Sequence, residues 1–244
     1  MRNQYSESLL VHFRRAEELR AEALDCFSID LNARQLCDLE LLLNRGMYPL
    51  DGFMNRTRYD MVLETMHLEN GTAWPMPICL DIDEEVAQSL SVGKRIALND
   101  SEGFLLAILT VNEVWQPDKK REAKKIYGTD DAAAHPGVRR LYDQVASWYV
   151  GGTIEGVSLP IHYDFQSMRL TPSETVRRFT MHGWRRVLGF HTTEYLHCAH
   201  REMVLTAARQ VGAAVFLHPV ADFSDPGDRD YYTQVRCYQA FTTK

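Results

Sequence analysis

The chain contains 244 residues, enough for one large or two small domains, and its 45% hydrophobic and 25% charged residues are ordinary for a globular protein. A formal net charge of -6 excludes a general nucleic-acid binder, because such proteins need a basic surface for the phosphate backbone. No apolar run reaches membrane-spanning length and residues 1–13 lack the features of a signal peptide, so we expect a cytoplasmic protein without membrane association. The five cysteines are scattered without a C-x-x-C pair and are expected to be reduced thiols.

The first 70 residues carry helical patterns. Apolar residues with charges between them predict an amphipathic helix over residues 6–24. A second helix is expected from Asn32 as its N-cap to Gly46 as its stop, and a third over residues 57–66. We expect these helices to be scaffold.

From residue 73 the sequence becomes typical of strands. Apolar runs over residues 74–81, 95–98 and 104–115, with a turn at 99–103 and a further strand at 153–159, favour a compact barrel or bent sheet. The charged run 119–125 indicates a solvated helix face rather than a binding patch.

A second domain is expected to begin after residue 168, which divides the chain into domains 1–168 and 169–244. Thr171-Pro-Ser-Glu174 combines an N-cap, a proline at the first helical position and a glutamate, and so predicts a helix that ends at Gly183. Residues 187–190, 197–212 and 213–217 then read as a strand, a helix and a strand, and a last helix is expected over 229–241. Because parallel sheets usually have about four or more strands, we expect either further sequence or a partner chain, as in a homo-oligomer.

Two histidines mark the start of the helix after residue 196. His197 and His200 are three residues apart and project from one face of its first turn. The turn before this helix lies at the carboxyl edge of the sheet, where open α/β folds bind ligands, and the helix amino end favours an anion. The pair therefore predicts a polyphosphate site.

Two other interpretations of this pair remain open. With nine histidines in the chain, an H-x-x-H spacing also arises by accident, in surface or satisfied core residues. A zinc site is a further alternative, although the H-E-x-x-H pattern is absent.

Six blocks of sequence, in this order along the chain, resemble the ATP sulfurylase (sulfate adenylyltransferase) family. They are Asp38-Leu-Glu-Leu-Leu-Leu-Asn44 with Pro49-Leu-Asp-Gly-Phe-Met54, Trp74-Pro-Met-Pro-Ile78, Ala97-Leu-Asn-Asp-Ser-Glu-Gly103, Tyr127-Gly-Thr-Asp130 with His135-Pro-Gly-Val138, Tyr149-Val-Gly-Gly152 and Leu170-Thr-Pro-Ser-Glu-Thr175. The resemblance implies an α/β protein with an α+β N-terminal domain. That domain would be a PUA-like β-barrel over residues 1–168, followed by part of a Rossmann-like nucleotidyltransferase domain over 169–244.

The resemblance also implies a reaction, in which a sulfate oxygen attacks the α-phosphorus of Mg-ATP to give adenylyl sulfate and pyrophosphate. Catalysis would then consist of positioning and fixed positive groups, with Mg²⁺ arriving on ATP. The expected catalytic residues are His197, His200 and Thr193. The expected nucleotide contacts are His191, Thr192, Glu194, His197, His200, Asp228 and Arg236.

The turn before the histidine pair departs from the family pattern. Residues 191–195 read His-Thr-Thr-Glu-Tyr where the family has Gln-Thr-Arg-Asn-Pro, so Thr193 replaces an arginine and Glu194 an asparagine. Further along, Asp222, Asp225 and Gln234 replace a glycine, a lysine and an arginine. Positive charge is lost and acid groups are gained in a crevice that should bind anions.

Three functional hypotheses follow. The first is an ATP sulfurylase of doubtful activity, with an unusual active turn, that missing C-terminal sequence would complete. The second is a non-catalytic scaffold or regulatory module associated with, or fused to, an adenylyl-sulfate kinase. The third is a nucleotide-binding module whose acidic turn accepts a cation or a cationic ligand.

Overall fold

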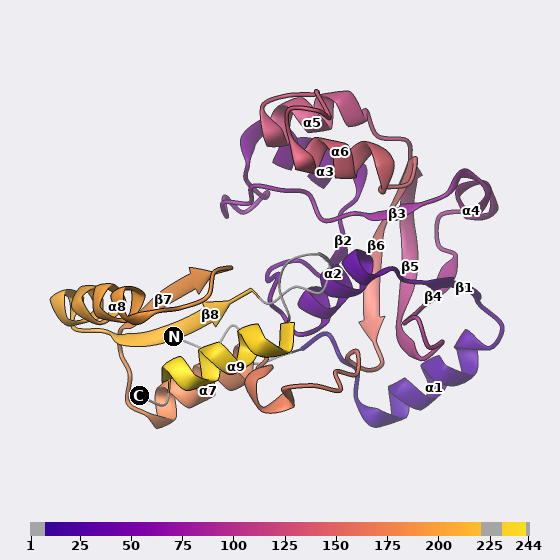
Figure 1. Cartoon of the computed structure of the whole chain (residues 1–244). Helices are drawn as coiled ribbons and strands as arrows, with labels where there is room; N and C mark the ends of the chain where they lie inside the picture. The colour runs from indigo at the N-terminus through magenta and orange to yellow at the C-terminus, as the bar shows by residue number, and fades with distance from the viewer. Residues whose placement is uncertain (1–7, 221–230, 243–244) are drawn as a thin grey trace. The chain divides into compact units, whose positions relative to one another are not determined.

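The computed structural model describes residues 8–220 and 231–242 (Figure 1). The chain divides into two compact units, residues 1–173 and 174–244. The first is built on a six-stranded mixed sheet with helices, and the second on two parallel strands with helices. This architecture confirms the α/β class with an α+β N-terminal part.

The sheet of the first unit follows the strand order β1-β4-β5-β6-β2, and β3 pairs with a different stretch of β6. All pairings are antiparallel except β1 with β4, and β4 and β5 form a hairpin around the predicted turn. The strands are β1 (Phe27–Asp30), β2 (Gly52–Phe53), β3 (Leu80–Ile82), β4 (Arg95–Asn99), β5 (Leu105–Trp115) and β6 (Trp148–Gly156).

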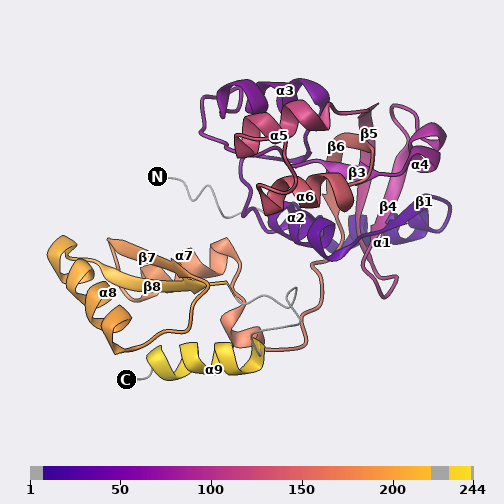
Figure 2. The same cartoon turned by 45° about the horizontal axis from the view of Figure 1, so that its top comes forward.

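The helices of this unit lie around the sheet, and Figures 1 and 2 show α3, α5 and α6 grouped together. The helices of the first unit are α1 (Phe13–Ala23), α2 (Ala33–Leu43), α3 (Arg56–Thr65), α4 (Glu84–Ser89), α5 (Lys119–Tyr127) and α6 (Pro136–Asp143), with a 3-10 turn at Gln166–Met168. The main core lies between α2, α3 and the sheet, where leucines such as Leu39, Leu42, Leu98 and Leu109 are fully buried. This apolar burial holds the first unit together.

Two glycines of β6 allow neighbouring backbone to approach closely. A Cβ on Gly151 would lie 2.3 Å from the Met54 carbonyl oxygen, and one on Gly152 would lie 2.2 Å from the Thr110 carbonyl oxygen. No side chain fits at such distances, so the Gly-Gly pair in one of the sequence blocks is required by packing.

Glu122 of α5 is a buried carboxylate within the charged run. Its side chain accepts hydrogen bonds from Tyr59 Oη (2.9 Å) and Tyr149 Oη (3.0 Å). Burial raises the pKa of Glu122, and the two tyrosine hydroxyls oppose that rise. Arg121 and Lys125 of the same helix pair with Glu64. Lys125 is exposed and Arg121 is half-buried, so the predicted solvated face is confirmed for Lys125, whereas the burial of Glu122 was not predicted.

The N-terminal predictions were right about most elements and wrong about some boundaries. The Asn32 cap is confirmed, with a reciprocal capping box to Gln35, but the first helix begins at Phe13 rather than at residue 6. The predicted strand over 74–81 is wrong except at its end, since β3 begins at Leu80. The prolines at 75 and 77 lack the N–H that strand pairing needs.

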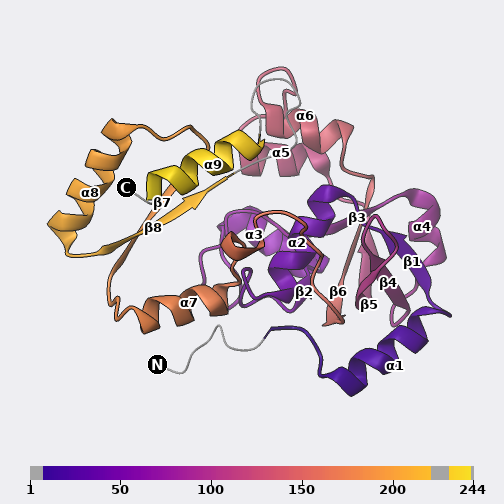
Figure 3. The ribbon, with the colours of Figure 1, turned by 60° about the horizontal axis from the view of Figure 1, so that its bottom comes forward.

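The second unit contains the predicted strand, helix and strand. Its elements are α7 (Pro172–Met181), β7 (Val187–Thr192), α8 (Cys198–Val211), β8 (Ala214–Pro219) and α9 (Tyr231–Thr242). Gly183 and Gly212 both have positive φ, at 68° and 59°, which confirms them as helix stops. Figures 2 and 3 show α7 and α9 on opposite sides of the two strands.

The two-stranded sheet is thinly covered. No residue of β7 or β8 is fully buried, whereas most residues of β4 and β6 are. Val204 and Ala208 of α8 and four residues of α9 supply most of the burial in this unit. Two strands give helices little area to pack on, as expected for a parallel sheet of this size.

Candidate nucleotide site

The predicted site begins at the carboxyl end of β7. His191 pairs in register with His218, and Thr192 with Pro219, so these residues lie at the edge where both parallel strands end. His191 Nδ1 donates to the His218 carbonyl oxygen (3.2 Å), and the two rings meet edge to face with centroids 5.9 Å apart. This edge is where open α/β sheets place their ligands.

The first turn of α8 brings His197 and His200 together. His197 is the N-cap with extended backbone (φ -132°, ψ 176°), and its N–H donates to His200 Nδ1 over 3.4 Å. The two rings lie with centroids 3.9 Å apart and are tilted by 31° to one another. Because His200 Nδ1 is an acceptor, its ring proton is on Nε2, which can donate to a ligand. The helix amino end adds free N–H groups and a positive dipole end.

The turn between β7 and α8 carries the residues that depart from the family pattern. Thr193 and Glu194 are exposed, and Glu194 N–H donates to Thr192 Oγ1 (3.0 Å). A carboxylate about 4 Å from a bound anion would be repelled by about 1 kcal/mol in water, and by about 4 kcal/mol at an effective dielectric near 20. The turn is therefore less favourable to sulfate than an arginine–asparagine pair.

Residues of α9 also belong to this region, a role that the sequence reading missed. Gln234 was identified only as the replacement of an arginine, but it is 3% exposed and its amide donates to the Thr193 carbonyl oxygen (2.8 Å). Tyr238, one turn further along, is 1% exposed and donates to the Glu194 carbonyl oxygen (3.1 Å). The signal in the sequence was the i, i+4 spacing of Gln234 and Tyr238, which places both on one face of the helix together with apolar residues.

The remaining candidates lie elsewhere or outside the described residues. Arg236 is exposed on α9 and, two residues from Gln234, projects about 200° away around the helix. Asp222, Asp225 and Asp228 lie outside the described residues. The structure therefore groups His191, Thr192, Thr193, Glu194, His197 and His200 between the end of β7 and the start of α8.

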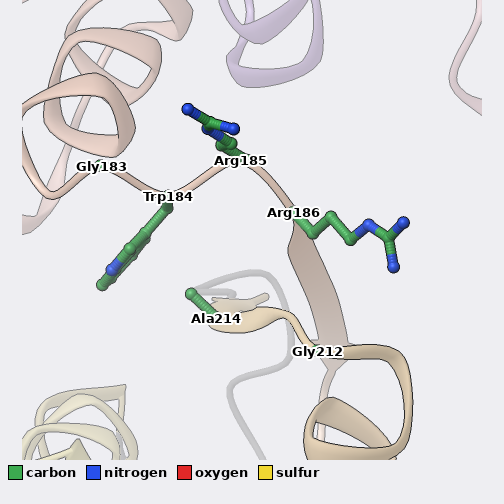
Figure 4. A pocket seen from close by; sticks show the side chains of 6 residues that line it. All are labelled: Gly183, Trp184, Arg185, Arg186, Gly212 and Ala214. Atoms are coloured by element: carbon green, nitrogen blue, oxygen red, sulfur yellow. The ribbon is translucent and has the colours of Figure 1, made fainter.

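A hollow of about 420 Å³ lies at the opposite, amino end of the strands. It is lined by Gly183, Trp184, Arg185, Arg186, Gly212 and Ala214. Figure 4 shows the side chains of Arg185 and Arg186 pointing away from Trp184 and in different directions. Arg186 Nη1 donates to the Val211 carbonyl oxygen (3.2 Å), so the two cations do not converge on one anion.

Within residues 8–220 and 231–242, no three His, Cys, Asp or Glu side chains form a group that could hold a metal ion. In the same part of the chain, no helix is long and apolar enough to cross a membrane.

Comparison with known proteins matches two stretches of the chain to two domain families. A PUA-like domain family matches residues 5–159, and the ATP-sulfurylase family matches residues 166–244. The chain is 46% identical over 219 residues to a sulfate adenylyltransferase of Kluyveromyces lactis, covering 90% of this chain and 43% of that protein. A sulfate adenylyltransferase of Mycosarcoma maydis is also 46% identical, over 228 residues, covering 92% of this chain and 40% of that protein.

A solved structure extends the comparison to three dimensions. The hexameric APS kinase from Thiobacillus denitrificans superposes with a TM-score of 0.77 at 32% sequence identity, covering 96% of this chain and 42% of that chain. The chain thus spans less than half the length of the relatives it matches. The two family matches and the shared fold show that the chain belongs to the ATP-sulfurylase family, with a PUA-like domain match over residues 5–159 and an ATP-sulfurylase match over residues 166–244.

Proposed function

We propose that this chain acts in sulfate activation as an ATP-sulfurylase-like module whose α8 amino end binds the polyphosphate of Mg-ATP. The observation that carries the proposal is the pairing of His197 and His200 at a helix amino end. Imidazole N–H groups and free backbone N–H groups there act together with the helix dipole on an anion. The relatives named sulfate adenylyltransferase support ATP, sulfate and adenylyl sulfate as the ligands.

In the reaction proposed for this site, a sulfate oxygen attacks the α-phosphorus of ATP. The bond between the α-phosphorus and the bridging oxygen breaks, and pyrophosphate leaves with the electron pair. His197 and His200 would hold the β- and γ-phosphates and stabilise the leaving charge, while His191, Thr192 and Thr193 would line the sulfate side. Mg²⁺ enters bound to ATP, as is usual for a cation that keeps its waters and the substrate phosphates.

The same site lacks groups that the chemistry needs. Thr193 has no charge to place on the transferring phosphoryl group, and an arginine in such a position contributes about 10³-fold or more in rate. Glu194 adds an acid group where sulfate would bind. We therefore propose that this chain binds the nucleotide phosphates but transfers the adenylyl group slowly or not at all.

A second candidate function has a specific observation in its favour. Almost the whole chain superposes on part of a protein named a hexameric APS kinase. A sulfurylase-like module that no longer catalyses adenylyl transfer could serve as the scaffold or oligomerisation unit of such an enzyme. In this second proposal, domains 1–168 and 169–244 position an adenylyl-sulfate kinase, fused or associated, in a homo-oligomer.

Calorimetric titration with Mg-ATP and with pyrophosphate tests the first proposal. His197→Ala should weaken both ligands by about tenfold or more, because a hydrogen bond to a charged group contributes about 1.5–3 kcal/mol. The matched control is His182→Ala, an exposed histidine between α7 and β7, which should leave both affinities unchanged. Wild-type protein that binds neither ligand, or equal losses in both variants, would contradict the phosphate site.

ATP formation from adenylyl sulfate and pyrophosphate separates the two candidates. Turnover by the unmodified chain would remove the scaffold function as its principal role. Phosphate binding without turnover, together with activation of an adenylyl-sulfate kinase in the assembled protein, would support it.

A further inference from the structure

Gln234 and Tyr238 form a buried polar pair on α9. They are one helical turn apart, 3% and 1% exposed, and Val235 and Tyr231 beside them are also buried. Polar groups at such depth are costly unless they are hydrogen-bonded, so their partners indicate what the pair does.

Each of the two side chains donates a hydrogen bond to a backbone carbonyl oxygen of the turn after β7. Gln234 Nε2 donates to the Thr193 carbonyl oxygen (2.8 Å) and to Tyr238 Oη (3.0 Å), and Tyr238 Oη donates to the Glu194 carbonyl oxygen (3.1 Å). Because Thr193 O is only an acceptor, the side-chain amide must present its NH₂ group to the turn, and both hydrogens are used.

The turn is also held from its own side. Glu194 N–H donates to Thr192 Oγ1 (3.0 Å), while the carbonyl oxygens of Thr193 and Glu194 face α9. Consecutive peptide groups are therefore fixed by hydrogen bonds, although the side chains of Thr193 and Glu194 remain exposed. Buried residues of α9 therefore help to fix the conformation of this turn.

We propose that Gln234 and Tyr238 are positioning residues, which lock the Thr193–Glu194 turn in one conformation and so fix the acid group of Glu194 at the edge of the anion site. The functional half of this inference, that Glu194 is held at the edge of the anion site, rests on the proposed function. The structural half, that the pair locks the turn, does not. Both amide hydrogens of Gln234 are donated within this network, so its side chain has no donor left for an anion. The change from the family's arginine to glutamine therefore replaces a cation by a neutral side chain that holds the turn.

Hydrogen exchange of the 244-residue protein tests the structural half. Gln234→Leu removes both donors at similar size, and Tyr238→Phe removes one hydroxyl. Exchange of the Glu194 and Tyr195 amides should become about tenfold faster in each variant, because losing a buried hydrogen-bond partner opens the turn locally. Gln234→Arg should keep slow exchange, since arginine can donate to the same carbonyl. Gln210→Leu, the same change at an exposed position of α8, is the matched control and should have no effect.

Two results would overturn the structural half. One is unchanged exchange at residues 194–195 in both Gln234→Leu and Tyr238→Phe. The other is an equal increase in the amides of α8 and β8, which would mean that the pair stabilises the whole unit and does not position the turn.

Affinity for adenylyl sulfate tests the functional half. Releasing the turn lets Glu194 move away from the anion, so Gln234→Leu should bind adenylyl sulfate about threefold more tightly with pyrophosphate affinity unchanged. Combined with Glu194→Gln, the same substitution should have no further effect. Lower affinity for both ligands would contradict this half. A wild-type chain that binds neither ligand would overturn the proposed function, while exchange would still decide whether the pair positions the turn.

Discussion

The hydrogen bond at the start of α8 makes two roles of His200 separable by mutation. His200 Nδ1 accepts the His197 N–H as part of a cap, and its imidazole is also a proposed phosphate ligand. His200→Ala removes the acceptor and the imidazole together. His200→Gln removes only the imidazole, because glutamine at the third helical position accepts the same N–H in a capping box.

The structure sets the size of each effect. A capping interaction contributes about 0.5–2 kcal/mol, and the 3.4 Å length of this one places it at the lower end, at ~0.5 kcal/mol. A hydrogen bond from an imidazole to a phosphate contributes about 1.5–3 kcal/mol, equivalent to ~10- to 100-fold in affinity. His200→Ala should therefore lose both stability and affinity, and His200→Gln affinity alone.

Urea unfolding and calorimetric titration with pyrophosphate measure the two quantities on the same samples. We expect His200→Gln to match the wild-type free energy of unfolding within ~0.3 kcal/mol while binding pyrophosphate about tenfold or more weakly. Wild-type pyrophosphate affinity in His200→Gln would refute the role of the imidazole. Equal stability of His200→Ala and His200→Gln would refute the cap.

Two further predictions concern a half-buried and a buried carboxyl group of the first unit, those of Asp38 and Glu122. Burial raises the pKa of Asp38 to about 6 against the opposing charge of Arg34. The unfolding free energy should therefore fall by up to about 3 kcal/mol as pH rises from about 4 through about 6. Asp38→Asn should remove that loss, so the unfolding free energy of the variant should rise relative to wild type over this pH range. Urea unfolding at each pH measures both proteins, and parallel pH profiles would contradict the prediction. Tyr59→Phe removes the 2.9 Å hydrogen bond to Glu122 and should cost about 1.5–3 kcal/mol in urea unfolding, whereas a change below ~0.5 kcal/mol would mean that Glu122 does not depend on it.

The sequence predicted the second unit well because its signals are local. The N-cap run from Thr171 and the stops at Gly183 and Gly212 act through neighbouring backbone, and α7, β7, α8 and β8 lie where these signals placed them. The β1, β2, α4 and α6 elements were not predicted. Strands β1 and β2 are short, and their pairing with β4 and β6 depends on residues far along the chain, which periodicity does not reveal.

The candidate site was only partly predictable for the same reason. The spacing of His197 and His200 reveals their proximity, since one helical turn brings them together. The contact of Gln234 with the Thr193 carbonyl oxygen joins residues far apart in the sequence, so the composition of α9 alone suggested only a lost charge. The burial of Glu122 in a charged run was missed because its partners Tyr59 and Tyr149 come from other elements.

We propose that this crevice has kept its phosphate-binding end and lost the positive lining of its sulfate side. The most direct test is the affinity for adenylyl sulfate of the wild-type chain and of the Thr193→Arg, Glu194→Asn double variant. Restoring one cation and removing one acid group should strengthen binding by about 100-fold, from about 1.5–3 kcal/mol for the arginine and about 1 kcal/mol for the carboxylate. If the wild-type protein binds adenylyl sulfate as tightly as the double variant does, the positive lining of the sulfate side has not been lost.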